Sequence, residues 1–430
     1  MTKSDNTGPT GVKERFVFLD ALRGFALLGI ALANFPEFGL WTFLTADSQA
    51  AMPTATADRL VRFLQYALVD GKFYTIFSLL FGVGFSLFLS RHSSSRFLLR
   101  MFILLGIGLL HLLFLWNGDI LSLYAAGGIL LVCFIRIPER RLIQIALLLI
   151  LLPVALDFAA TLFSFDMAAP FYQKWWAVAA AKGIDEGNFA TWLRDAHSYP
   201  QMYKFLQQGA WERLWEFAEG HRLPKVLGLF ILGYVIGRRR LYARLASLPL
   251  GRWLHRIAIP SLFLSLLYAY SATQNQPWGQ TAHALLYAFS VIPLALCYIM
   301  AFALLYVHSQ AIEASQSSLA EAAQTISDKS SQTSSPKEDS YALLFRLLAA
   351  PGRMALTNYI GQTLIGILLF YGIGFGLGTS FGLITIEFTA LIVFLLQVLL
   401  SCLWLRYFRF GPLEWIWRVL TYGKVFPIRR

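Results

Sequence analysis

The chain has 430 residues, of which 57% are hydrophobic and only 14% are charged, and its mean hydropathy is +0.58. Soluble domains carry about 25% charged residues, so this composition excludes a large soluble core. The net charge is +12, but the basic residues lie in short segments between apolar runs, which is typical of membrane-protein loops and excludes nucleic acid as a partner. We therefore predict an all-α polytopic membrane protein whose principal partner is the lipid bilayer.

Ten apolar segments are long enough to be membrane helices, and we expect them to form one bundle. The predicted helices span 16–36, 73–91, 96–116, 119–137, 142–164, 224–237, 254–272, 281–307, 350–374 and 383–406. The polar stretch 165–223 is rich in tryptophan, which favours helices lying in the membrane interface. The stretch 309–340 is rich in Ser, Gln, Ala and Glu, and it predicts a flexible linker with a weak helix around 310–325.

The predicted organisation has seven parts. They are a cytoplasmic tail (1–15), a five-helix membrane half (16–164), an extracytoplasmic and interfacial loop (165–223), helices six to eight (224–308), a flexible cytoplasmic linker (309–340), helices nine and ten (341–406) and a basic aromatic cytoplasmic tail (407–430).

Lysine and arginine distribute unequally between the two predicted sides of the membrane. They follow helices two, four and six and recur in the C-terminal tail, whereas the opposite turns 117–119, 274–280 and 375–381 contain neither. The positive-inside rule therefore predicts a multi-pass protein of the plasma (inner) membrane with both termini in the cytoplasm.

Charged and polar side chains lie inside several predicted membrane helices, where they are costly and favour a functional role. Asp20 and Arg23 are three residues apart and can pair on one helix face, and Asn34 lies close to the same face three turns later. The pair either pins the first helix to a neighbour or lines a substrate site. The candidate substrate-lining residues are Asp20, Asn34, Asp70, Lys72, Asn358 and Gln362, with an interfacial lysine as the alternative for Lys72.

His111 and Asp119 are candidate catalytic residues. His111 lies roughly 7 Å inside the end of the third predicted helix, and Asp119 follows across the turn Asn117-Gly118-Asp119. Asp119 can orient the His111 ring for general acid–base catalysis. The alternatives are a packing histidine and an aspartate that caps the fourth helix. Since the sequence contains neither metal-ligand spacing nor a Walker loop, we expect no metal.

Several segments resemble a known family. They are LDALRGFALLGIALANF, DGKFYTIFSLLFGVGFS, HLLFLWNGDILSLYA, GRMALTNYIGQT and GPLEWIWRVLTYGK, and they resemble the YeiB-like bacterial inner-membrane family, the domain of unknown function 418. The opening LDALRG also resembles wider groups of membrane acyltransferases. These groups include bacterial O-acyltransferases of surface polysaccharides and the lysosomal heparan glucosaminide N-acetyltransferase.

The wider resemblance implies transfer of an acyl group from cytoplasmic acyl-coenzyme A to a hydroxyl or amine acceptor across the membrane. In the O-acyltransferase pattern a histidine stands eleven residues after the first-helix arginine, where this chain has Asn34. The glucosaminide enzyme is similar here because it also has an asparagine near this point. His111 would then replace the missing base.

The implied partners are a small-molecule donor and a small-molecule acceptor, and assembly into a homo-oligomer stays open. The candidate residues for binding coenzyme A, chosen for their predicted cytoplasmic position, are Arg23, Arg100, Arg346 and Arg353. The alternative function is a transporter or carrier of a small anionic or lipid-like solute. Transporters commonly contain inverted repeats, and the absence of a clear repeat favours the enzyme.

The predicted topology can be tested with fusions to alkaline phosphatase, which is active only outside the cytoplasm. Fusions after residue 430 or within 309–340 should be inactive, and fusions within 165–223 should be active, because of the charge distribution. Phosphatase activity in cells carrying each fusion is the measurement. The opposite result at any of these places would overturn the ten-helix topology.

Overall fold

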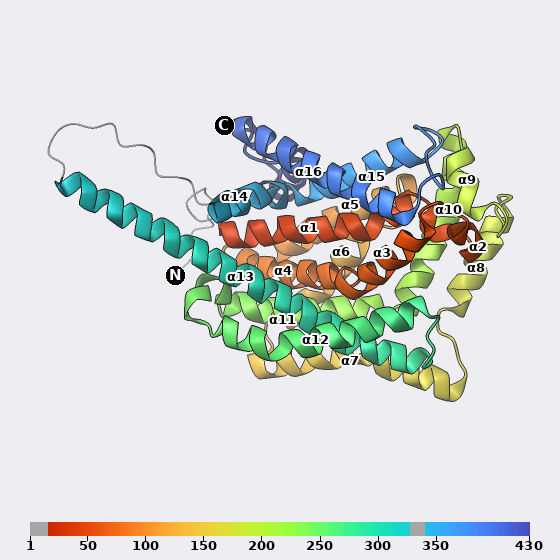
Figure 1. Cartoon of the computed structure of the whole chain (residues 1–430), viewed down its shortest axis with the longest axis horizontal. Helices are drawn as coiled ribbons and strands as arrows, with labels where there is room; N and C mark the ends of the chain where they lie inside the picture. The colour runs from red at the N-terminus through yellow and green to blue at the C-terminus, as the bar shows by residue number, and fades with distance from the viewer. Residues whose placement is uncertain (1–15, 327–339) are drawn as a thin grey trace.

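The computed structural model describes residues 16–326 and 340–430, and it describes residues 319–326 by their backbone alone. Within these ranges the regular structure is helical, apart from an isolated bridge between Phe408 and Arg429. The helices run mostly along the longest axis of the molecule and form one bundle (Figure 1). The prediction of an all-α polytopic membrane protein is confirmed. The predicted tail 1–15 lies outside the described residues.

One group of helices forms the body of the bundle. They are α1 (Val17–Phe38), α3 (Ala55–Leu68), α4 (Lys72–Leu89), α5 (Ser94–Phe114), α6 (Leu121–Leu131), α7 (Glu139–Phe163), α11 (Arg222–Arg238), α12 (Leu250–Thr273), α13 (Gln280–Ile326), α14 (Ser340–Arg353), α15 (Ala355–Phe370) and α16 (Leu383–Tyr407). Six helical segments in the described ranges are long and apolar enough to cross a membrane, and 121–134 and 355–370 are shorter apolar helices.

The other α-helices of the described residues gather at the two ends of the bundle. They are α2 (Ala46–Ala50), α8 (Ala169–Ala180), α9 (Phe189–Asp195), α10 (Tyr199–Glu219) and α17 (Pro412–Tyr422). Helices α2 and α8–α10 cover one end, whereas the C-terminus and the far end of α13 lie at the other (Figure 1). Helices α8–α10 are formed by the tryptophan-rich stretch 165–223. Between α8 and α10, Trp175 stacks on Trp215 with ring centres 5.2 Å apart.

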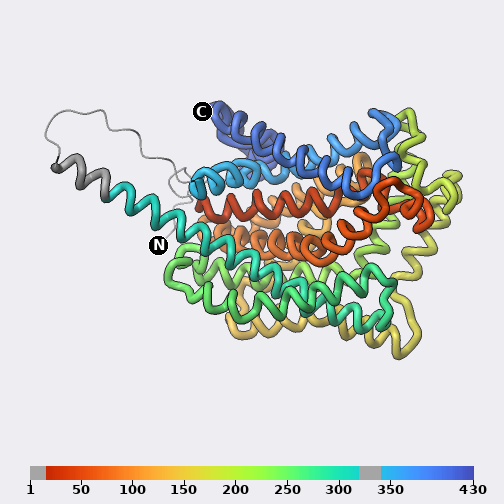
Figure 2. The backbone as a smooth tube through the Cα atoms, viewed as in Figure 1, coloured from red at the N-terminus to blue at the C-terminus, as the bar shows by residue number. Residues whose placement is uncertain are grey.

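Helix α1 is central and contacts α4, α14, α15 and α16. In Figure 2 it runs between the C-terminal helices and α4. Its tightest contact is with α14, because a Cβ at Gly24 would lie 1.9 Å from the carbonyl oxygen of Leu348 and a Cβ at Gly352 would lie 1.8 Å from that of Asp20. Small residues allow such backbone contact between membrane helices, where no water drives association. These glycines therefore fix α1 against α14.

A second pair of glycines joins α4 to α11. A Cβ at Gly82 would lie 2.0 Å from the carbonyl oxygen of Phe230, and one at Gly233 would lie 2.1 Å from that of Leu79. By contrast, the outer faces of the bundle carry exposed large apolar side chains, such as Leu148 on α7. In a bilayer these side chains contact lipid.

Two predicted boundaries differ from the structure. The predicted helix 350–374 is two helices, α14 and α15, because the backbone leaves the helical conformation at Met354, just after Pro351 and Gly352. Helix α13 continues to Ile326, so the first part of the predicted linker 309–340 is helical, in line with the weak helix expected there. The rest of that linker, 327–339, lies outside the described residues.

The contact between α1 and α14 predicts the effect of adding one methyl group. Gly24→Ala should lower the melting temperature of the purified protein, because overpacking typically costs about 1–3 kcal/mol. Thermal unfolding in detergent is the measurement. The control is Gly106→Ala on α5, where no atom lies within 4 Å of the added Cβ. It should be neutral or slightly stabilising, since alanine favours helix. Equal melting temperatures for the two variants would contradict the close contact.

Candidate functional site

A cavity of about 430 Å³ lies inside the bundle, between α1, α4, α5, α14, α15 and α17. Its charged and titratable lining residues are Arg23, Arg91, His92, Arg100, Arg353, Arg409, Arg418, Asp20 and Glu414. The lining thus contains six arginines and two carboxylates, and the rest of it is largely apolar. An excess of guanidinium groups in a low-dielectric cavity favours an anionic ligand.

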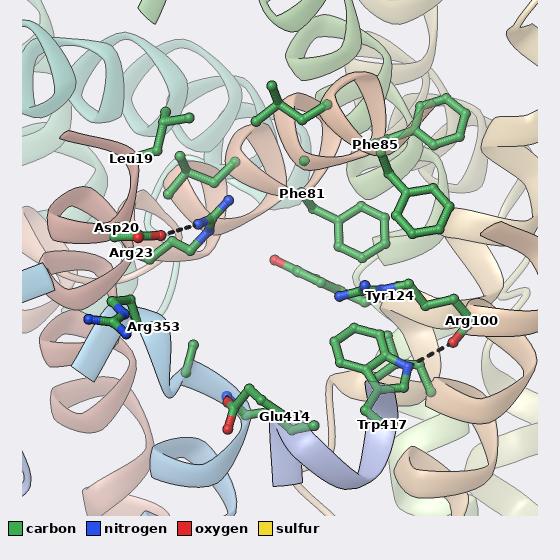
Figure 3. A pocket seen from close by; sticks show the side chains of 18 of the residues that line it. Leu19, Asp20, Arg23, Phe81, Phe85, Arg100, Tyr124, Arg353, Glu414 and Trp417 are labelled. Atoms are coloured by element: carbon green, nitrogen blue, oxygen red, sulfur yellow. Dashed lines mark hydrogen bonds and ion pairs between the residues drawn. The ribbon is translucent and has the colours of Figure 1, made fainter. Parts of the chain in front are cut away.

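Two of these arginines extend into the cavity from opposite sides (Figure 3). Arg23 donates to the Asp20 carboxylate at 2.7 Å, as the local spacing predicts. The Arg100 guanidinium carbon lies 3.9 Å from the ring centre of Trp417, and the Trp417 indole donates to the Arg100 carbonyl oxygen at 3.0 Å. The stacked tryptophan holds the Arg100 side chain in a fixed position over the cavity.

Helix α17 closes this side of the cavity and is anchored by Glu414. One carboxylate oxygen of Glu414 accepts hydrogen bonds from the backbone N–H groups of Leu356 and Thr357 at 2.7 and 3.1 Å, and the other accepts from the Thr357 hydroxyl at 2.5 Å. Glu414 therefore caps the first turn of α15 from a different helix. Burial raises the pKa of Glu414, whereas its hydrogen bonds to Thr357 lower it.

The inner end of the cavity is formed by Ile120, Tyr124 and Tyr359. The Tyr124 hydroxyl lies 2.8 Å from the Ser78 hydroxyl, and the Tyr359 hydroxyl accepts from the Ile120 N–H at 3.3 Å. The ring of Tyr359 also lies 5.4 Å from the ring of His111. A tyrosine wall therefore separates the arginine-lined cavity from His111.

His111 and Asp119 meet as the sequence predicts. His111 Nδ1 lies 3.0 Å from Asp119 Oδ1, and both side chains are almost fully buried. The two Asp119 oxygens also accept from the backbone N–H groups of Leu121 and Ser122 at 3.1 and 2.8 Å. Asp119 is thus both the cap of α6 and the partner of the ring, because a carboxylate accepts several hydrogen bonds at once. The second ring nitrogen, Nε2, lies 3.0 Å from the Thr363 hydroxyl.

A buried polar cluster from α10 lies beside this pair. Arg213 Nε donates to the Asp119 carbonyl oxygen at 2.8 Å, and Arg213 also pairs with Glu216. Asn117 donates to Glu212 at 2.7 Å. Burial, together with the charges of Glu216 and Glu37, raises the pKa of Glu212 well above its usual range. The end of the bundle covered by α10 is therefore polar close to His111.

Asn358 and Gln362 join α15 to α16. Asn358 donates to the Ser401 hydroxyl at 3.0 Å, Gln362 donates to Gln397 at 3.0 Å, and Gln397 donates to the Asn358 carbonyl oxygen at 2.8 Å. Both predicted substrate-lining residues thus lie in a buried network between helices and outside the cavity lining.

The remaining predicted residues also lie away from the cavity. Lys72 is fully buried and donates to the Tyr66 carbonyl oxygen at 2.6 Å, and Asp70 accepts from the Tyr268 hydroxyl at 2.6 Å. These contacts attach the start of α4 to α3 and α12. Asn34 is half-buried on α1, outside the cavity lining.

Arg346 is exposed on α14 and pairs with Glu313 of α13 at 3.5 Å. Of the predicted coenzyme-binding arginines, the cavity contains Arg23, Arg100 and Arg353 but not Arg346. Within the described residues no cluster of three or more His, Cys, Asp or Glu side chains has the arrangement needed to hold a metal ion.

Sequence reasoning missed Thr363, the lining residues between α4 and α5, and the lining residues that follow α16. The missed lining residues include Arg91, His92, Arg409, Trp417, Arg418 and Tyr422. The periodic aromatic residues of α17 indicate an amphipathic helix, which could have identified this segment as packed against the bundle. No local pattern connects Thr363 with His111, because the two lie 252 positions apart.

Comparison with known proteins identifies relatives of this chain. Residues 330–424 match the family described as "Protein of unknown function (DUF418)". The chain is 28% identical to the uncharacterized 39.9 kDa protein in amylase 3'region of Bacillus acidopullulyticus, over 98% of this chain and 97% of the relative. It is 28% identical to the uncharacterized protein YeiB of Escherichia coli (strain K12), over 96% and 98%. It is 26% identical to the uncharacterized protein YxaH of Bacillus subtilis (strain 168), over 98% of both.

No solved structure is significantly similar to this chain. The predicted relationship to YeiB and to the domain of unknown function 418 is confirmed. The names of these relatives state no activity.

Proposed function

We propose from its site geometry that this chain, which belongs to the YeiB-like family (domain of unknown function 418), is a membrane acyltransferase. It would move an acyl group from acyl-coenzyme A to a hydroxyl or amine acceptor. The observation that carries the proposal is the cavity, which leads from a cluster of arginines to a tyrosine wall in contact with His111.

The cavity suits the chemistry of the donor. Coenzyme A carries several phosphate groups, and arginine binds phosphate through two parallel charge-assisted hydrogen bonds. The apolar side chains between the arginines and Tyr359 suit an uncharged arm and an acyl group, and about 430 Å³ lies within the usual size of ligand pockets. Phosphates held by the arginines would direct the thioester towards Tyr359 and His111.

His111 and Asp119 suit the acceptor chemistry. The acceptor hydroxyl or amine loses a proton when it takes the acyl group, and a histidine ring such as His111, which Asp119 Oδ1 contacts at 3.0 Å, can accept that proton. The cluster of Arg213, Glu212 and Glu216 gives the α10 end of the bundle the polarity that a hydroxyl or amine substrate needs.

The orientation that fits this reaction follows from charge. The arginine-lined end would face the cytoplasm, where acyl-coenzyme A is made, and α8–α10 would face the opposite side of the inner membrane. The acyl group would then cross the membrane within the bundle, and the coenzyme would remain on its own side.

A carrier of anions is the alternative, because a cavity with six arginines and two carboxylates also suits an anion that is moved unchanged. The two functions differ in the fate of the thioester. An acyltransferase releases free coenzyme A, whereas a carrier leaves the donor intact.

Binding of the donor should depend on the arginines of the cavity. Arg23→Ala and Arg353→Ala should each weaken coenzyme A binding by about 1.5–3 kcal/mol, because each removes a charge-assisted contact. Asp20→Asn should tighten binding, since it removes the carboxylate that competes for Arg23. Calorimetry on the purified protein measures these changes.

Arg346→Ala is the matched control, because Arg346 lies on α14 but outside the cavity. The affinity of Arg346→Ala for coenzyme A should equal that of the parent protein. A parent protein that binds no coenzyme A would remove the donor site and favour the carrier.

Turnover should depend on His111. His111→Ala should lower the rate of acyl-coenzyme A consumption by about 10²–10⁴-fold with coenzyme A binding retained, because the base is lost. Asp119→Asn should lower the rate less, since it disturbs the orientation and charge around the ring without removing the base. Asparagine also still caps α6. A kinetic assay beside melting curves measures both, and the exposed His255 of α12 supplies the control His255→Ala. Full activity in His111→Ala would exclude His111 as the base.

A further inference from the structure

Both ring nitrogens of His111 are occupied. Nδ1 faces Asp119 Oδ1 and Nε2 faces the Thr363 hydroxyl, each at 3.0 Å. Asp119 already accepts two backbone N–H groups, and a carboxylate has no proton to donate, so Nδ1 must carry the ring proton. Nε2 of the neutral ring is then an acceptor. The Thr363 hydroxyl therefore donates to Nε2.

Thr363 differs from five helical threonines that bond within their own helix, and it resembles Thr357, whose hydroxyl donates to Glu414 of α17. A buried helical threonine commonly satisfies its hydroxyl by donating to the carbonyl oxygen four residues earlier. The threonines that do so here are Thr75, Thr161, Thr273, Thr389 and Thr421. Thr363 is fully buried, yet its hydroxyl contacts a ring on another helix. The contact with His111 thus takes the place of a local bond that α15 offers.

We propose that Thr363 is the nucleophile of the acyl transfer and forms an acyl-threonine intermediate, an inference that rests on the function proposed above. The order Thr363 hydroxyl, His111 ring, Asp119 carboxylate has the geometry of a hydroxyl nucleophile, its base and the group that orients the base. In this arrangement the proton within reach of His111 Nε2 is that of Thr363.

The reaction then proceeds in two balanced steps. Thr363 Oγ1 attacks the thioester carbonyl, its proton passes to His111 Nε2, the C–S bond breaks, and the proton leaves on the coenzyme A thiol. The acceptor hydroxyl or amine next attacks the threonine ester and gives its proton to Nε2. The ester C–O bond breaks, and the proton returns to Thr363 Oγ1. The products are free coenzyme A, the acylated acceptor and the unchanged protein.

The position of Thr363 suits an intermediate that must avoid hydrolysis. Thr363 is one helical turn after Tyr359 on the same face of α15, so it lies behind the tyrosine wall at the inner end of the cavity. The proposed reaction requires the Tyr359 ring to move aside so that the thioester reaches the hydroxyl, and its return would keep water from the ester. On the other side of Asp119 lies the polar cluster of α10, where Arg213 donates to the Asp119 carbonyl oxygen, and the acceptor would approach from there.

The test is covalent labelling of the purified full-length protein with acetyl-coenzyme A and no acceptor. The parent should release one equivalent of thiol in a burst, and peptide mass spectrometry should find one acetyl group on Thr363. Hydroxylamine, added as an artificial amine acceptor, should remove the label and give continuous thiol release. Thr363→Ser keeps a hydroxyl and should also be labelled.

Thr363→Val, which keeps the shape of the side chain, should lose the label and reduce thiol release at least about 100-fold. It should still bind coenzyme A and melt as a folded protein. Thr389→Val on α16 removes a threonine hydroxyl elsewhere and should be labelled like the parent. Binding of coenzyme A and the melting curve show whether Thr363→Val is folded. If it is not, labelling of the parent and of Thr363→Ser at position 363 still tests the inference.

Three outcomes would overturn the inference. An acetyl group on another residue, or thiol release from Thr363→Val at the parental rate, excludes Thr363 and leaves the acyltransferase intact. Steady turnover with hydroxylamine but no burst and no label indicates direct transfer, with Thr363 as a positioning residue. A parent that binds no coenzyme A and releases no thiol removes the acyltransferase, and the intermediate with it.

Discussion

The contact between α1 and α14 through Gly24 and Gly352 is the constraint on which the site depends. It brings the backbones of the two helices together, and so places the pair Asp20–Arg23 beside Arg353 at the entrance of one cavity. The chain then leaves the helical conformation at Met354 and starts α15, which carries the inner wall of that cavity. The positions of the charged end of the cavity and of the tyrosine wall therefore both depend on how α14 packs on α1, and a displacement of α14 would move both.

Buried polar groups in this bundle belong to two classes. One class is satisfied within the protein: Asn358, Gln362 and Gln397 bond to one another between α15 and α16, and Lys72 bonds to a backbone carbonyl. Such groups hold helices together, because an unpaired polar group in an apolar medium is costly. The other class is the arginine cluster of the cavity, whose cations outnumber the carboxylates around them. These arginines have partners of their own, such as Asp20 for Arg23 and Trp417 for Arg100, and the excess of cations over carboxylates is the observation on which the proposed anion site rests.

Sequence reasoning succeeded where the physics is local. The run of apolar residues predicted a helix at 383–406 and the structure has Leu383–Tyr407, while the pairs Asp20–Arg23 and His111–Asp119 follow from a helix turn and a tight hairpin. Hydropathy does not record which helices touch. It therefore could not show that α15 places Thr363 against His111, or that α17 packs onto α5. Likewise, hydropathy could not predict the break between α14 and α15 at Met354, because the helices on both sides of it are apolar.

The last helix of the chain has a consequence for biogenesis. Arg409, Trp417 and Tyr422 line the cavity, and Glu414 caps α15, so a wall of the site comes from residues that are translated after helices α1–α16. A nascent chain with its earlier helices already inserted still lacks this wall. Insertion of helices α1–α16 and completion of the cavity are therefore separate steps in the maturation of the protein. A truncation before α17 would therefore remove this wall of the cavity and the cap of α15 while leaving α1–α16 in the chain.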